Sequence, residues 1–272
     1  MFGKFMVTKS RFFVWGIAFF VCAGCAVNPL TGESQLMLIP PEQDIAIGQQ
    51  YAPEVEKQMG GRIPNDDLQR YVDNVGRKVS YFSQRADWDY HFVALQDKSV
   101  NAFALPGGYI FITKGMLKSL TTEAQLAAIL GHETAHVVAR HSSAAMSNQI
   151  GADIVLSAVL SEKTPPGVRT AADIGRQIVT LNYSRKDEKE ADLAGLDYTV
   201  KAGYNPYGMV ETMQILEEQE KTRPIEFLAS HPSPENRITY LKDKIETKHY
   251  DLAGLRIGKE EYSANVLSRL NN

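Results

Sequence analysis

The His-Glu-Thr-Ala-His motif at residues 132–136 constrains this chain more than any other feature of its sequence. Its two histidines are four residues apart, so in an α-helix they lie one turn apart on the same face. Two imidazoles in this arrangement can bind one Zn²⁺ ion. Apolar stretches flank the motif, AQLAAIL before it and VV after it, which indicates a mostly buried helix. Unpaired imidazoles would be costly there, so the motif predicts a metal centre rather than two incidental histidines.

We expect His132 and His136 to bind the zinc and Glu133 to act as the general base, because Glu133 can reach an attacking water molecule without ligating the metal. A catalytic zinc site needs a third protein ligand. The metzincin pattern does not supply it, since Ser142 stands at the position of its last histidine. On a continuous helix His141 lies about 140° around the axis from His136 and is expected to point elsewhere as a polar or capping residue.

The third ligand is therefore expected to be a carboxylate on another helix, and the stretch YSRKDEKEADLAG at 183–195 offers one. Glu188 and Asp192 are four residues apart and share a helix face. Glu188 can ligate zinc, while Asp192 can accept the outer N–H of a ligand histidine and fix its tautomer. Glu190 competes with Glu188 from about 200° around the helix. We expect Asp187 and Glu190 to face solvent among neighbouring basic residues.

The rest of the pattern predicts an α+β fold, a mostly helical zincin (gluzincin) domain with a small, mainly antiparallel sheet. Alternation predicts the strands, and apolar spacing, caps and breakers predict the helices. The strands are expected at 89–95, 101–105 and 109–113, and the helices at 41–58, 65–82, 122–141, 149–160, 184–203, 206–220 and 234–247.

The second of these strands has a functional interpretation beside a structural one. An exposed strand next to the motif helix can pair with the backbone of an extended substrate. This makes Asn101, Ala102, Phe103 and Ala104 candidate substrate-binding residues. The alternative is a purely structural hairpin that turns at Pro106-Gly107-Gly108.

The N-terminus is typical of an export signal. Three basic residues precede the apolar run 12–23, which is too short to span a bilayer. The run ends in Cys22-Ala-Gly-Cys25, which resembles a bacterial lipobox with Cys22 where leucine is usual, so Cys25 is expected to be lipidated. Ordinary cleavage nearby, or a short uncleaved anchor, is the alternative. The expected organisation is a signal peptide at 1–24, a lipidated tether at 25–40, a metallopeptidase domain at 41–250 and a C-terminal extension at 251–272.

The charge balance narrows the class of partner. The chain has 29 basic and 32 acidic residues, a formal charge of −3 and 44% apolar residues. These values exclude a disordered chain and give no basic excess for nucleic acid. Loss of the three leader cations leaves 26 basic against 32 acidic residues, a charge near −6. The acyl chains would then have to hold the protein on a membrane.

Taken together, the motifs resemble metallopeptidase family forty-eight, which includes HtpX and the Oma-type and CAAX prenyl proteases, and most of all its periplasmic BepA- and LoiP-type lipoprotein branch. The resemblance is carried by H-E-x-x-H, by S-R-x-x-E-x-E-A-D-x-x-G at 184–195, by Asn101–Gly108, and by Ser230-His231-Pro232 with Arg237. It implies one zinc ion per chain, held by His132, His136 and Glu188. It also implies substrates that are unfolded or misassembled envelope proteins, with outer-membrane proteins or their assembly machinery as partners.

Two residues keep more than one interpretation. His231 is a catalytic candidate as an oxyanion partner, or a removable fourth zinc ligand that keeps the enzyme latent, which the resemblance favours, or a structural cap. Arg237 either pairs with an acidic group near the site or is a solvated helix charge. The function expected is a zinc metalloendopeptidase in the periplasm, anchored by lipid to the outer membrane. The alternatives are a chaperone-like binding lipoprotein with a closed zinc site, and a zinc hydrolase of non-peptide substrates with a deep pocket.

Overall fold

A computed structural model describes residues 24–160, 181–233 and 236–270. Its main sheet has three strands, β3 (His91–Leu95), β4 (Ala102–Leu105) and β5 (Tyr109–Thr113), in the order β3–β5–β4. β4 and β5 form the expected antiparallel hairpin, but β5 also pairs with β3 in parallel, so this sheet is mixed. Helices cover both faces of the sheet, which explains why β5 reads YIFIT, almost all apolar. The α+β class is confirmed.

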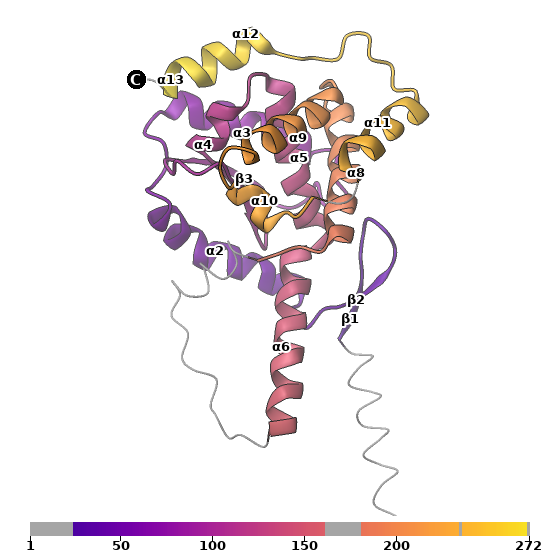
Figure 1. The fold of residues 1–272 in the computed structure, drawn as a ribbon. Helices are drawn as coiled ribbons and strands as arrows, with labels where there is room; N and C mark the ends of the chain where they lie inside the picture. The colour runs from indigo at the N-terminus through magenta and orange to yellow at the C-terminus, as the bar shows by residue number, and fades with distance from the viewer. Residues whose placement is uncertain (1–23, 161–180, 234–235, 271–272) are drawn as a thin grey trace, which may run out of the picture.

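One face of the sheet is covered by α2 (Pro41–Gln58), whose bounds agree with the sequence prediction. Its Tyr51 and Val55 pack on Phe103 and Phe111. The chain then turns through two glycines with positive φ at residues 60–61. Figure 1 shows α2 along one side of the molecule, with the strands between it and the central helices.

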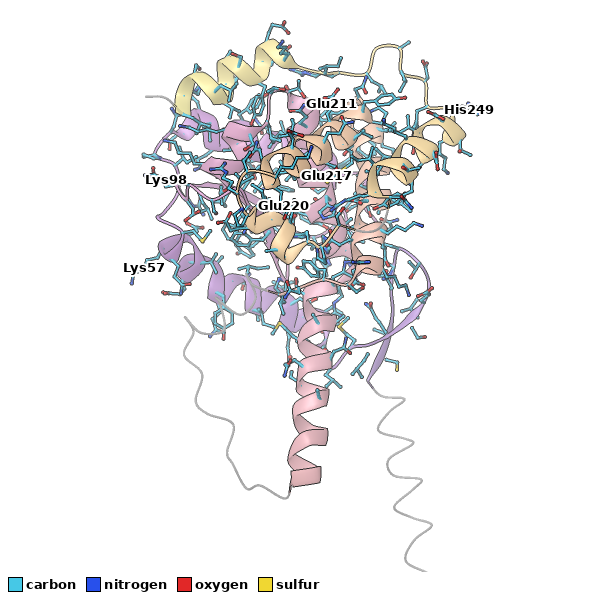
Figure 2. The ribbon with its side chains drawn as sticks, in the orientation of Figure 1. Lys57, Lys98, Glu211, Glu217, Glu220 and His249 are labelled. Atoms are coloured by element: carbon cyan, nitrogen blue, oxygen red, sulfur yellow. The ribbon has the colours of Figure 1, made fainter. Side chains whose placement is uncertain are left out.

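The other face is covered by α3 (Asp66–Ser80) and α5 (Glu123–Ala139). Asn65 caps α3 by accepting a hydrogen bond from the Leu68 N–H. Every residue of α5 is buried, because α8 (Arg185–Lys201) and α9 (Tyr207–Glu220) cover its far side. Glu211 and Glu220, two charged side chains of α9 that Figure 2 labels, are exposed. The motif helix is therefore the central element of the fold.

The chain leaves α5 by a sharp turn and not by a continuous helix. Arg140 has a left-handed backbone, with φ 59°, and α6 (His141–Leu160) starts at the next residue and extends away from the body (Figure 1). The Arg140 guanidinium binds the Asp44 carboxylate, from the first turn of α2, and the Ile39 carbonyl, from the segment just before α2. The prediction of one helix to His141 and a separate helix from 149 was therefore wrong.

The remaining helices are shorter. They are α4 (Lys114–Ser119), α10 (Glu226–Ser230), α11 (Arg237–Lys248), α12 (Lys259–Tyr262), η1 (Ser263–Leu267) and α13 (Ser268–Leu270). The last three pack on the core, where Tyr262, Val266 and Leu270 are buried and the Tyr262 hydroxyl donates to the Leu117 carbonyl. The C-terminal segment is thus part of the folded body.

The stretch predicted as a tether begins with a small hairpin of β1 (Cys25–Val27) and β2 (Ser34–Leu36). The hairpin is attached to the body, because the Gln35 amide donates to the Ala139 carbonyl and the Asn28 amide donates to Glu190. Residues 1–23 of the predicted signal peptide at 1–24 lie outside the described residues. Within the described ranges, every helix is too short or too polar to cross a bilayer.

Candidate metal centre

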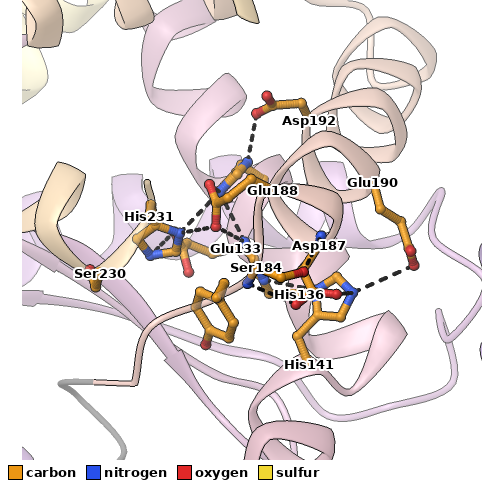
Figure 3. A network of polar contacts seen from close by, with 12 residues as sticks. Glu133, His136, His141, Ser184, Asp187, Glu188, Glu190, Asp192, Ser230 and His231 are labelled. Carbon is orange, nitrogen blue, oxygen red and sulfur yellow. Dashed lines mark hydrogen bonds and ion pairs between the residues drawn. The ribbon is translucent and has the colours of Figure 1, made fainter. Parts of the chain in front are cut away.

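Four buried side chains converge on one point in the middle of the molecule: His132 and His136 of α5, Glu188 of α8, and His231 just after α10 (Figure 3). One ligand atom from each lies within 4.8 Å of all the others. The two Nε2 atoms of His132 and His136 are 3.0 Å apart. Glu188 is 3.3 Å from the His136 Nε2 and 3.5 Å from the His132 Nε2.

This convergence depends on a close crossing of α5 and α8. At the crossing Gly131 faces Gly195, and a Cβ on Gly195 would lie 2.7 Å from the His132 backbone nitrogen. Real side chains do not tolerate so short a distance. The two glycines thus allow the helix backbones to touch, which brings Glu188 within reach of both motif histidines.

The residues present fit a zinc ion. The His132 Nε2 has the His136 Nε2, the His231 Nδ1 and the Glu188 carboxylate within 3.5 Å. A neutral imidazole has only one N–H and a carboxylate has none. The group therefore holds too few protons for every one of these atoms to form a hydrogen bond with a neighbour. A set of two or three imidazoles and one carboxylate is the donor chemistry that zinc prefers.

Glu133 lies beside this group but outside it. Its side chain is fully buried, and neither carboxylate oxygen has a hydrogen-bond partner among the described residues. Its Oε1 lies 3.8 Å from the His231 Nε2. Burial raises the pKa of Glu133, although His231 and His132 oppose the change. A carboxylate with free lone pairs and a raised pKa can accept a proton at neutral pH.

Asp192 supports the first histidine of the motif. Its Oδ1 lies 3.0 Å from the His132 Nδ1 and accepts a 2.6 Å hydrogen bond from the Arg237 guanidinium, while the Tyr240 hydroxyl donates to the other oxygen. Burial acts to raise the pKa of Asp192, but Arg237 and His132 together outweigh burial, so that pKa is lowered. Arg237 is buried and also 3.4 Å from Glu188, so it is not a solvated helix charge.

His231 belongs to the ligand group by position. Its Nδ1 lies 2.9 Å from the Glu188 Oε1 and 3.4 Å from the His132 Nε2. Its ring stacks on Phe227 with centroids 4.4 Å apart, which fixes its plane. Burial lowers the pKa of His231, but the Glu188 and Glu133 carboxylates raise it further than burial lowers it.

His141 does not point away, contrary to the sequence prediction. Its Nδ1 lies 2.9 Å from the His136 Nδ1, on the side of that ring opposite the ligand group. The prediction of a 140° angle assumed a continuous helix, but the left-handed turn at Arg140 changes the direction of the chain before His141. The expectation that Glu190 faces solvent was also wrong, since its side chain is 8% exposed and its Oε1 lies 3.6 Å from the His141 Nε2. Asp187, which has an oxygen at the same distance, is 34% exposed. The only sequence signal was a polar run, Arg-His-Ser-Ser, directly after an apolar helix.

The candidate substrate strand is an edge strand among the described strands, but it is not exposed. Asn101, Ala102, Phe103 and Ala104 are each at most 6% exposed. Two segments lie against it: the Phe227 N–H of α10 donates to the Val100 carbonyl, and the Tyr183 hydroxyl bonds Ser142, whose own hydroxyl is 3.5 Å from the Ala104 carbonyl.

Tyr183 also covers the ligand group. Its ring stacks on His136 with centroids 4.1 Å apart, and its N–H donates to the Ser230 carbonyl. The α10 segment and Tyr183 thus lie over the centre, while α10 and Ser142 of α6, which Tyr183 holds, lie at the two ends of the strand beside it. The candidate lipidation residue, Cys25, is exposed at the start of the N-terminal hairpin.

Comparison with known proteins agrees with this geometry. A family model described as "Peptidase family M48" matches residues 64–245, which include all the residues of the centre. The chain is 27% identical to the beta-barrel assembly-enhancing protease of Escherichia coli K12 over 230 residues, 79% of this chain and 46% of that protein.

Two further relatives are the mitochondrial metalloendopeptidase OMA1 of Schizosaccharomyces pombe and the metalloprotease LoiP of Escherichia coli K12. The first is 30% identical over 177 residues, 64% of this chain and 52% of that protein. The second is 27% identical over 151 residues, 54% of this chain and 60% of that protein. This chain spans about half the length of these relatives.

Proposed function

This chain belongs to peptidase family M48, and on that premise we propose that it is a zinc-dependent metalloendopeptidase of the bacterial envelope. The observation that carries the proposal is the Glu133 carboxylate, buried without a partner among the described residues beside a group of two histidines and a glutamate. A protein that used the metal only for binding or stability would gain nothing from an unpaired buried carboxylate, which is costly to maintain.

Each residue has a role in this proposal. His132, His136 and Glu188 hold the zinc, and Asp192 fixes the tautomer of His132. Zinc bound there would polarise the scissile carbonyl and make water a better nucleophile. Glu133 takes a proton from the attacking water and passes it to the leaving amine, a role that its raised pKa suits.

We further propose that His231 is the removable fourth ligand, not the oxyanion partner. Its Nδ1 lies inside the ligand group, 2.9 Å from Glu188, which supports the first role. Activity then requires residues 226–231 and the Tyr183 segment to move, which would free both a ligand position and the edge of β4. An extended peptide could add to that edge through Asn101–Ala104 by backbone hydrogen bonds.

The substrate class follows from this pairing and from the relatives. Backbone pairing reads little side-chain sequence and requires an extended chain. One relative is by name a beta-barrel assembly-enhancing protease. We therefore propose unfolded or misassembled outer-membrane proteins as substrates.

We also propose that the protein lies in the periplasm, exported by a signal peptide at 1–24 and held on the outer membrane by lipid on Cys25. In this proposal residues 41–250 are the metallopeptidase domain and residues 251–272 are its C-terminal extension.

The test is casein cleavage by the full chain purified in detergent, with zinc content measured in parallel. We expect the wild type to cleave, Glu133→Gln to keep its zinc and lose activity by about 10²–10⁴-fold, and His231→Ala to cleave faster than the wild type. If neither the wild type nor His231→Ala cleaves casein or an unfolded outer-membrane protein while zinc is bound, the peptidase proposal fails. The chaperone-like alternative would then explain the chain better.

A further inference from the structure

We propose that His141 is a positioning residue that holds His136 in its ligating tautomer, as one link in a chain of polar groups that runs from the metal centre to Asn28. The inference rests on the metal site of the proposed function. It concerns the His136 Nδ1, the ring nitrogen that does not face the ligand group. The two-histidine motif alone assigns no hydrogen-bond partner to this atom.

The first step is the proton between the two rings. The Nδ1 atoms of His136 and His141 are 2.9 Å apart, so one proton lies between them. The His136 Nε2 faces His132 and Glu188 and must keep its lone pair to act as a ligand. A neutral His136 therefore carries its proton on Nδ1 and donates it to the His141 Nδ1.

The second step follows for His141 itself. Because its Nδ1 accepts, its own proton sits on Nε2. That atom is buried and lies 3.6 Å from both the Asp187 Oδ1 and the Glu190 Oε1 (Figure 3). The two carboxylates thus favour the Nε2–H tautomer of His141, which leaves the Nδ1 free to accept from His136.

Each carboxylate is held in place by a separate part of the chain. Asp187 accepts the Ser184 N–H in the capping box at the start of α8. Glu190 accepts the Asn28 amide from the N-terminal hairpin. The orientation of His136 is therefore coupled to the first turn of α8 and to a hairpin more than a hundred residues away in sequence.

The two zinc-facing histidines are supported in different ways. His132 faces a carboxylate, Asp192, whose charge Arg237 neutralises. His136 faces the His141 ring, and the Asp187 and Glu190 carboxylates lie beyond that ring. His141 and both carboxylates line a pocket of about 520 Å³. The His136 branch thus reaches a solvent-accessible pocket, while the His132 branch ends on buried Arg237 and on the half-buried Tyr240.

The experiment measures zinc affinity of the full chain by competition with a chelator, without any peptidase assay. His141→Phe keeps a ring but removes the acceptor, and we expect zinc affinity to fall about 10–100-fold. His141→Asn places an amide oxygen near the Nδ1 position, and we expect it to recover at least half of the loss on a logarithmic scale. His91→Phe makes the same change at a half-buried histidine, the first residue of β3, and should leave affinity within twofold of the wild type.

The outcomes separate this inference from the proposed function. If the wild type binds no zinc, the proposed function fails. If the wild type binds zinc and His141→Phe binds it equally well, or if His141→Asn is as weak as His141→Phe, the positioning role is overturned. Thermal unfolding of the metal-free variants distinguishes a structural role, which would lower the midpoint without changing affinity. Should His141→Phe not fold, ¹⁵N spectra of histidine-labelled wild type decide, since the proposal requires His141 to be protonated on Nε2 and not on Nδ1.

Discussion

At the scale of single residues, Asp192 shows how the buried charged groups of the centre depend on one another. It contacts the His132 ring on one side and the buried Arg237 guanidinium on the other. Among the described residues, removing its charge would leave Arg237 with only the more distant Glu188 carboxylate, at 3.4 Å. A buried charge that loses its partner is strongly destabilising, whereas an exposed ion pair contributes little.

We expect Asp192→Asn to lower the free energy of unfolding of the metal-free protein by about 3 kcal/mol and zinc affinity by about 10–100-fold. Urea unfolding and chelator competition measure the two effects. Asp197→Asn is the matched control on the same helix, because Asp197 is half exposed and binds Lys244 and Tyr250 at the surface. It should cost less than about 1 kcal/mol. Equal losses for the two variants would contradict the special position of Asp192.

At the scale of elements, the crossing of α5 and α8 determines whether the ligands meet. Gly195→Ala would place a methyl group 2.7 Å from the His132 backbone nitrogen and force the helices apart. We expect a loss of about 1–3 kcal/mol together with weaker zinc binding, measured by thermal unfolding and chelator competition. Ala194→Ser adds one atom at the next position, which faces a pocket, and should change neither quantity measurably. Unchanged zinc affinity in Gly195→Ala would show that the ligands can still meet when the two helices are further apart.

The same scale explains what could be predicted from the sequence. α2 was predicted with its full bounds, and the starts of α3 and α8 were predicted to within one residue, at 65 and 184, because these signals are local in sequence. Glu188 and Asp192 share a helix face by spacing alone, although choosing Glu188 over Glu190 as the ligand drew on the family resemblance.

What the sequence could not indicate depends on contacts between distant residues. The turn at Arg140 is held by Asp44 and Ile39, about a hundred residues earlier. No local pattern indicates these contacts, so the helix was predicted to end two residues too late and His141 was given the wrong direction. The parallel pairing of β3 with β5 and the closure of the centre by Tyr183 fail to show in the sequence for the same reason.

At the scale of the whole molecule, the candidate ligands come from three parts of the chain: residues 132 and 136, residue 188, and residue 231. A zinc ion there would join α5, α8 and the segment after α10, which are otherwise held together by apolar packing and by Arg237. The unfolded chain cannot present these ligands together, so zinc binds the native state preferentially and its binding free energy adds to stability.

This argument predicts a thermal midpoint that depends on zinc concentration. At free zinc about 1,000 times the dissociation constant, the stabilisation is about 4 kcal/mol, which corresponds to a rise of about 10 °C for a body of this size. Circular dichroism melts in zinc buffers spaced tenfold apart measure it. Glu133→Gln should rise as much as the wild type, because Glu133 lies outside the ligand group, whereas His132→Ala should rise far less. A midpoint that does not change with zinc would mean that these four side chains do not form a metal site.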